Sequence, residues 1–173
     1  MMIMKKFFLT LLITLWSSFL FAEIPYYLDF NYILNESNAG KKAQTTLKNR
    51  LDSGIKSLNG KEKSIQESEK KLIQKKKIIS AEEYKKEIQT LRASVAKLQK
   101  ERSELINSIA KKKKKAKDEL LKNLNPIIKD YMIEKKIRMV VNKKALVLAD
   151  ENLDITQDII KIFNTKLKEI KLN

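Results

Sequence analysis

Residues 72–91 read LIQKKKIISAEEYKKEIQTL, and this stretch predicts a reversal between two long helices. Ser80-Ala81-Glu82-Glu83 fits a capping box, in which the Ser80 hydroxyl accepts a hydrogen bond from the Glu83 amide and the Glu83 carboxylate accepts one from the Ser80 amide. Lys75, Lys76 and Lys77 precede the reversal, where the C-terminal end of a helix favours cations. We therefore expect the tip of a helical hairpin at residues 77–81.

Apolar residues recur at helical spacing on both sides of this reversal. Before it, at intervals of seven, stand Leu51, Leu58, Ile65, Leu72 and Ile79; after it, mostly at intervals of three, four and seven, stand Tyr84, Ile88, Leu91, Val95, Leu98, Leu105, Ile109 and Ala116. Helices joined by a short connection pack as antiparallel neighbours. The pattern predicts an antiparallel coiled-coil arm over residues 41–124, with helices at about 40–77 and 81–124.

The predicted seam of this arm has gaps. Glu62, Glu69 and Lys76 stand where a stable coiled coil places apolar side chains. Gly54 and Gly60 each weaken a helix by about 1 kcal/mol relative to Ala. Two interpretations remain open, namely sequence drift on a solvated helix, or a pliability that lets the arm bend or splay.

The positive charge of the chain is concentrated on the predicted arm. The whole chain has a net charge of +16, and residues 41–123 hold 25 Lys and Arg against 11 Asp and Glu. A run of five lysines, namely Lys111, Lys112, Lys113, Lys114 and Lys115, is hereafter called the lysine run. The run is either a solvated collar with its stems lying along the helix, or a positive lining near the arm root that faces an anionic partner or an internal space. We take the lysine run and Lys75, Lys76 and Lys77 as candidate residues for binding a polyanion or another anionic partner.

The flanks of the arm predict a small body over residues 23–40 and 125–173. Strands are expected at residues 24–30, 137–141 and 145–149, the last two as a hairpin-like unit around residues 142–144. Asn125-Pro126 predicts a joint with a new or kinked helix, and a last helix follows residue 155. The fold class is therefore α+β and predominantly α, with a long helical hairpin inserted in a small β body.

Three strands bury too little core to stand alone, so we expect an obligate oligomer. The residues expected to build this oligomerisation body are Leu28, Phe30, Val140, Leu146, Leu148, Ile155, Ile159 and Phe163.

The N-terminus predicts export. Lys5 and Lys6 precede an apolar run that ends at Ala22, which is typical of a cleaved secretory signal over residues 1–22 and thus of an exported protein. The alternative, an uncleaved membrane anchor, would need a longer apolar run. The chain has no Cys and no His, which removes disulfides, the commonest soft-metal ligands and the commonest general base. We predict no enzyme activity, no cofactor and no metal.

Several stretches resemble signatures of the Skp/OmpH periplasmic chaperones. They are LDFNYILNESNAGKKA at residues 28–43, MVV at 139–141, ALVLAD at 145–150 and LDIT at 153–156, with the Ser-Ala-Glu-Glu tip and the Asn-Pro-Ile joint between them. The resemblance implies a homotrimer whose three arms enclose a cavity. It also implies an ATP-independent holdase that binds unfolded outer-membrane β-barrel proteins and opposes their aggregation.

Two other functions compete with this interpretation. One is an envelope structural protein whose arm binds anionic lipid or lipopolysaccharide at the membrane surface. The other is a polyanion binder, which the net charge fits. The arm has few aromatic residues for stacking and only Arg50, Arg92 and Arg102 for bidentate contacts, so we expect no specific nucleic acid as a partner.

Overall fold

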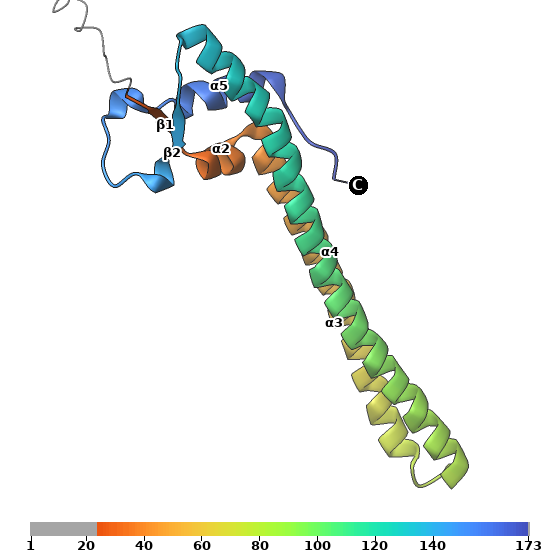
Figure 1. The fold of residues 1–173 in the computed structure, drawn as a ribbon. Coiled ribbons are helices and arrows are strands. Elements are labelled where there is room, and N and C mark those ends of the chain that lie inside the picture. The colour runs from red at the N-terminus through yellow and green to blue at the C-terminus, as the bar shows by residue number, and fades with distance from the viewer. Residues whose placement is uncertain (1–23, 173) are drawn as a thin grey trace, which may run out of the picture.

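The computed structural model describes residues 24–172, and the predicted signal at residues 1–22 lies outside them. Along the chain come β1 (Tyr26–Leu28), α2 (Phe30–Glu36), α3 (Asn38–Lys75), α4 (Ala81–Lys135), β2 (Val140–Asn142), two 3₁₀ helices (Lys143–Ala145 and Glu151–Leu153) and α5 (Thr156–Lys166). Figure 1 shows α3 and α4 as a long hairpin that projects from a small body of β1, β2, α2 and α5. The predicted fold class is confirmed, because the chain is mainly helical and its hairpin arm is inserted into a body with a small sheet.

The tip of the hairpin carries the predicted capping box. The Ser80 amide donates to Oε2 of Glu83 at 3.2 Å, and the Glu83 amide donates to Oγ of Ser80 at 3.2 Å. α3 ends at Lys75, two residues before the expected end, because the amides of Ile78 and Ile79 both donate to the Lys75 carbonyl.

No helix among the described residues is both long and apolar enough to cross a membrane.

A polar pair fills one gap in the arm seam, and one glycine lies close to a leucine of the facing helix. Leu58, Leu72 and Leu98 are buried between the helices. At the Glu62 gap, Nη2 of Arg102 donates to Oε2 of Glu62 at 2.6 Å. Gly54 has a packing role that neither interpretation of the seam included, since a Cβ there would lie 2.6 Å from Cδ1 of Leu105.

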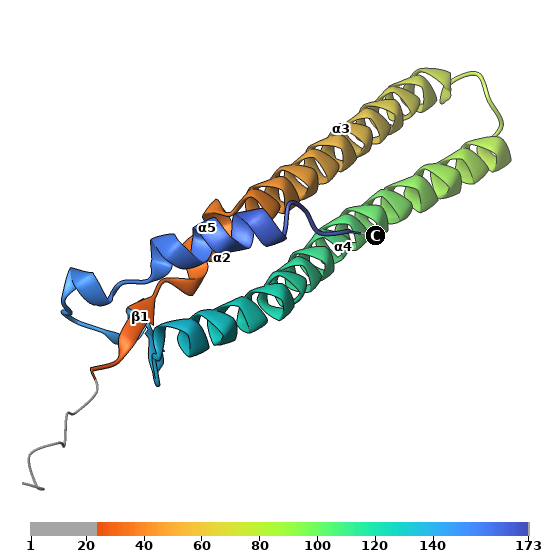
Figure 2. The ribbon, with the colours of Figure 1, turned by 90° about the horizontal axis from the view of Figure 1, so that it is seen from above.

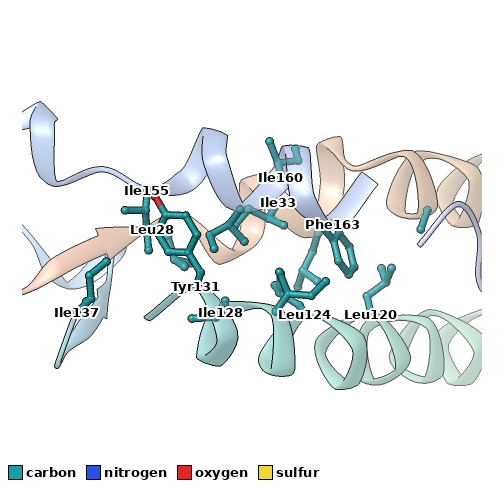
Figure 3. Close-up of a cluster of buried hydrophobic side chains, with 14 residues drawn as sticks. Leu28, Ile33, Leu120, Leu124, Ile128, Tyr131, Ile137, Ile155, Ile160 and Phe163 are labelled. Atoms are coloured by element: carbon teal, nitrogen blue, oxygen red, sulfur yellow. The ribbon is translucent and has the colours of Figure 1, made fainter. Parts of the chain in front are cut away.

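The core of the body gathers apolar side chains from distant parts of the chain (Figure 3). Leu28, Ile33, Leu124, Ile159 and Phe163 are fully buried and come from β1, α2, α4 and α5. α4 therefore reaches beyond the arm and supplies one wall of the body.

The predicted joint at Asn125-Pro126 does not start a new helix, because α4 runs through Pro126 to Lys135. Pro126 is exposed, while Leu124, Ile127 and Ile128 on either side of it are buried in the body core. This packing holds the helix together across the proline, which removes one backbone donor.

The predicted hairpin between the second and third strands is wrong. β2 pairs instead with β1, in parallel, in the register Tyr26↔Val140, Tyr27↔Val141 and Leu28↔Asn142. The first two strands are also shorter than expected. The expected third strand at residues 145–149 is a 3₁₀ turn followed by an irregular loop, because the Asn142 side chain accepts from the Lys144 amide at 3.1 Å and starts that turn.

A polar cluster around Thr156 closes the body. The buried Thr156 hydroxyl accepts from the Asp29 amide at 2.9 Å and donates to Oδ1 of Asp154. The Ile155 amide donates to the Tyr27 carbonyl at 2.9 Å. These bonds join the N-terminal strand to the start of α5, more than a hundred residues away.

Candidate functional site

The lysine run lies on α4, on the body side of the arm. Lys112 is half-buried, and the other four lysines are exposed. None of the five forms an ion pair with any of residues 24–172. Their positive charges are therefore left to solvent and counterions.

A groove of about 430 Å³ lies beside the lysine run, and we call it the root groove. Lys113, Lys114 and the further lysine Lys117 line one side of it. Its apolar lining is formed by Leu34, Ala43, Leu47, Ala110, Ala116 and Leu120, and its polar lining by Asn31, Asn35 and Gln44. The groove thus places ammonium groups next to an apolar floor, a combination suited to an amphiphilic anionic ligand.

A second groove, here called the tip groove, has a volume of about 500 Å³ near the far end of the arm. Most of its lining is apolar and includes Ile65, Leu72, Ile73, Tyr84, Ile88, Leu91 and Val95, with Glu69 and Arg92 as charged members. Ile73 is 62% exposed and Val95 is 42% exposed. Large apolar side chains are therefore accessible on an arm that is otherwise strongly charged.

Two of the three candidate lysines at the tip have partners within the chain. Nζ of Lys75 lies 3.8 Å from Oε1 of Glu87, and Nζ of Lys76 lies 5.8 Å from the centre of the Tyr84 ring. Lys77 is exposed in the turn. The local field at the tip is thus partly compensated, in contrast to the field of the lysine run.

The arm also contains charges that hold its helices together. Nζ of Lys61 donates to Oε2 of Glu101 at 2.6 Å, and this hydrogen bond lowers the pKa of Glu101. With the Glu62–Arg102 pair, it crosses from α3 to α4. These paired side chains serve the seam and do not add to the free positive charge of the arm.

The residues predicted for the oligomerisation body divide into three groups. Leu28, Ile155, Ile159 and Phe163 are buried in the core of the single chain, and Phe30 and Val140 pack partly buried against it. Leu146 is half-buried. Leu148 is 92% exposed and stands next to Val147, which is fully exposed.

Except for Ala116, which belongs to the predicted seam, sequence reasoning missed the apolar members of the root groove and the exposed Met139 and Val147 of the body. Apolar residues of the groove occur four apart, as Ala43 and Leu47 on α3 and as Ala116 and Leu120 on α4. This helical spacing next to the lysine run was the available signal for an apolar groove. No group of side chains among residues 24–172 could hold a metal ion.

Comparison with known proteins identifies the family. The family model described as "Outer membrane protein (OmpH-like)" matches residues 26–163. Among solved structures, a candidate outer membrane chaperone (OmpH-like) from Caulobacter crescentus superimposes with a TM-score of 0.82 at 20% sequence identity, covering 87% of this chain and 90% of the other. No curated protein matches the chain. The chain belongs to the OmpH-like family of outer membrane proteins.

Proposed function

We propose that this chain is an ATP-independent periplasmic holdase that binds unfolded outer-membrane β-barrel proteins in a basic cavity between the arms of a homotrimer. Membership of the OmpH-like family supports a chaperone role in general and implies a periplasmic location. Binding of the unfolded chain opposes its aggregation, because a bound client is removed from the pool that self-associates. On this proposal, the signal at residues 1–22 directs export of the chain and is then cleaved.

The observation that carries the proposal is the uncompensated lysine run beside the root groove. An exposed cluster of like charge attracts an anionic polymer over about a Debye length, which is ~8 Å at physiological salt. The root groove and the tip groove add apolar surface that aliphatic and aromatic side chains of an unfolded client can contact. Many weak contacts of both kinds suit a partner without a fixed shape.

The trimer is supported by surface that the single chain leaves open. β2 has one neighbouring strand among the described residues, so its other edge is unpaired. Met139 is 59% exposed beside that strand, and Val147 and Leu148 are exposed in the loop after it. An unpaired edge next to exposed apolar side chains favours association with another copy.

The test compares two variants with the same change in charge. One replaces residues 111–115 with Gln. The control replaces five exposed lysines near or on the body with Gln, namely Lys122, Lys129, Lys144, Lys161 and Lys168. The readout is the affinity for a denatured, acidic outer-membrane β-barrel protein at several salt concentrations, with the oligomer mass measured by light scattering.

We expect the arm variant to lose about tenfold or more in affinity at low salt and to show a flatter salt dependence. The control should bind like the wild type, and both should keep the same mass. Unchanged affinity of the arm variant at low salt would contradict the basic-lining proposal.

A second candidate function follows from the root groove. Its lysines next to an apolar floor also fit the head group and acyl chain of an anionic lipid or lipopolysaccharide, as in an envelope structural protein. Binding to anionic vesicles without suppression of client aggregation would favour this alternative.

A further inference from the structure

The C-terminal tail, residues 167–172, lies against the root of the arm. α5 ends at Lys166, and Leu167 has an extended backbone from which the chain continues along α3 and α4 (Figures 1 and 2). Leu172 is 7% exposed and belongs to one buried cluster with Ala43, Leu47 and Ala116. A side chain near the end of the chain thus packs with both helices of the arm.

Polar contacts fix the same segment to the start of α3. Nζ of Lys42 donates to Oε2 of Glu169, and this hydrogen bond lowers the pKa of Glu169. Just before the tail, Oδ1 of Asn164 accepts from the Asn38 amide at 2.8 Å. α3 is therefore tied to α5 and to the tail within its first two turns.

The tail also contacts the body. Leu167 and Ile170 pack against the body core, and Ile170 packs against the root cluster as well. The tail is thus a bridge between two hydrophobic clusters, one in the body and one in the arm. It lies beyond the residues 26–163 that match the OmpH-like family.

The root is the part of the arm where such a bridge has most effect. Two of the three arm residues in the cluster are alanines, whose small side chains bury little area between α3 and α4. The lysine run directly precedes Ala116 on α4, and its like charges do not favour close packing. Leu172 therefore supplies apolar contact that the two helices lack by themselves.

We propose that residues 167–172 form a strap that holds α3 and α4 together at the arm root, and that its release lets the two helices separate there. The bound and released tail are two states of one local equilibrium. Any variant that removes Leu172 from the cluster shifts this equilibrium toward the open root. This inference concerns arm motion and stands independently of which client the arm binds.

The test uses neighbouring positions of the tail in the full chain. Leu172→Ser removes the buried side chain, whereas Lys171→Ser changes an exposed side chain next to it and serves as the control. Leu172→Met is the conservative variant that should restore packing. Hydrogen exchange is measured for root peptides 41–49 and 110–118, for mid-arm peptide 86–100 and for body peptide 156–163.

For Leu172→Ser we expect about a tenfold faster exchange in the root peptides, with mid-arm and body peptides unchanged. Lys171→Ser and Leu172→Met should match the wild type. Equal root exchange in Leu172→Ser and the wild type would overturn the strap, and so would faster exchange throughout the body, because that result would make the tail a general stabiliser of the fold.

A distance measurement gives a second readout. The chain has no Cys, so spin labels at Lys48→Cys on α3 and Lys111→Cys on α4 report the separation at the root without background. Labelled chains are diluted with unlabelled ones so that contacts between copies do not contribute. Leu172→Ser should broaden and lengthen this distance distribution; an unchanged distribution would also overturn the proposal.

Discussion

The same substitution, Gly to Ala, is expected to have opposite effects at two positions of α3. All three glycines of the chain, Gly40, Gly54 and Gly60, lie in this helix, and none has a positive φ. Alanine in a helix interior is favoured over glycine by about 0.5–1 kcal/mol, because glycine loses more backbone entropy on folding. Gly54 and Gly60 lie in the helix interior and share this gain, whereas Gly40 lies in the first turn of α3, where the gain is at most as large. The surroundings of the new Cβ therefore decide the sign.

Those surroundings differ sharply. A Cβ at Gly60 would have no atom within 4 Å, so Gly60→Ala should keep the full gain. A Cβ at Gly40 would lie 1.9 Å from the backbone carbonyl oxygen of Leu34 and 2.9 Å from Oγ of Ser37. A backbone carbonyl cannot rotate away as a side chain can, so α2 itself must move. Overpacking of this kind costs about 1–3 kcal/mol and occasionally more.

Gly54→Ala should fall between the two. Its Cβ would meet Cδ1 and Cδ2 of Leu105 at 2.6 and 2.7 Å, and these atoms are the flexible end of a side chain. Truncating Leu105 should therefore relieve the strain. We expect Leu105→Ala to be less destabilising in the Gly54→Ala background than in the wild type.

Thermal unfolding followed by circular dichroism measures this series. A change of 1 kcal/mol shifts the melting temperature by about 2–4 °C for a chain of this size. Gly60→Ala should melt about 1–4 °C above the wild type and Gly40→Ala several degrees below it. Protein concentration is kept equal, because self-association makes melting temperatures depend on it. If Gly40→Ala melted as high as Gly60→Ala, the assigned packing of α2 on α3 would be refuted.

Three further predictions concern the body. Thr156→Val leaves the Asp29 amide without its acceptor and should lower the free energy of unfolding by about 1–3 kcal/mol in denaturant titrations. Partial burial opposes ionisation of Asp154, but hydrogen bonds from Thr156 and Lys143 outweigh this effect and lower the pKa of Asp154. The stability that the ionised carboxylate contributes is present above its ordinary pKa of 3.8 and is lost as the pH falls. Asp154→Asn should therefore flatten the acid side of a pH–stability profile. Burial, followed by a hydrogen bond to a carboxylate, raises the pKa of Tyr131 to about 12, so stability should fall as the pH rises from 10 toward 12 and Tyr131→Phe should flatten this fall.

The arm was predictable because its determinants are local. The capping box at Ser80 and Glu83 is formed by residues three apart, and the helices follow from spacing along single segments. Each signal agrees with its neighbours, so no distant contact can override it. The positions of the helix ends were predicted less well, because the Lys75 carbonyl is shared by two turn amides that the spacing does not indicate.

The sheet was not predictable in the same way. Residues 145–149 have strand-like composition, but a strand forms only where a partner is available. β2 follows α4 and pairs in parallel with β1, whose residues come from the other end of the chain. A local hairpin was the natural expectation for neighbouring segments. Only the tertiary packing of α2, α4 and α5 shows that β1, and not residues 145–149, lies beside β2.

The candidate site was predicted in composition but not in geometry. Composition placed the lysine run near the arm root, whereas the rotation of α4 decides that Lys113 and Lys114 line the groove and that Lys112 does not. The tail was missed because Leu167, Ile170 and Leu172 are too few to indicate an element by spacing. The arm partners of Leu172, namely Ala43, Leu47 and Ala116, lie more than fifty residues away in sequence.

Contacts of different strength hold α3 and α4 together at the body, at the root and in the middle of the arm. The body end is anchored by a fully apolar core, which salt does not screen. The middle depends on pairs such as Glu62–Arg102, whose side chains are about 40% exposed, and such pairs contribute less than about 1 kcal/mol each. Between them, the root joins α3 to α4 through two alanines, a leucine and the tail. Because the weakest apolar contact lies beside the densest positive charge, separation of the helices there would widen the arm next to the lysine run.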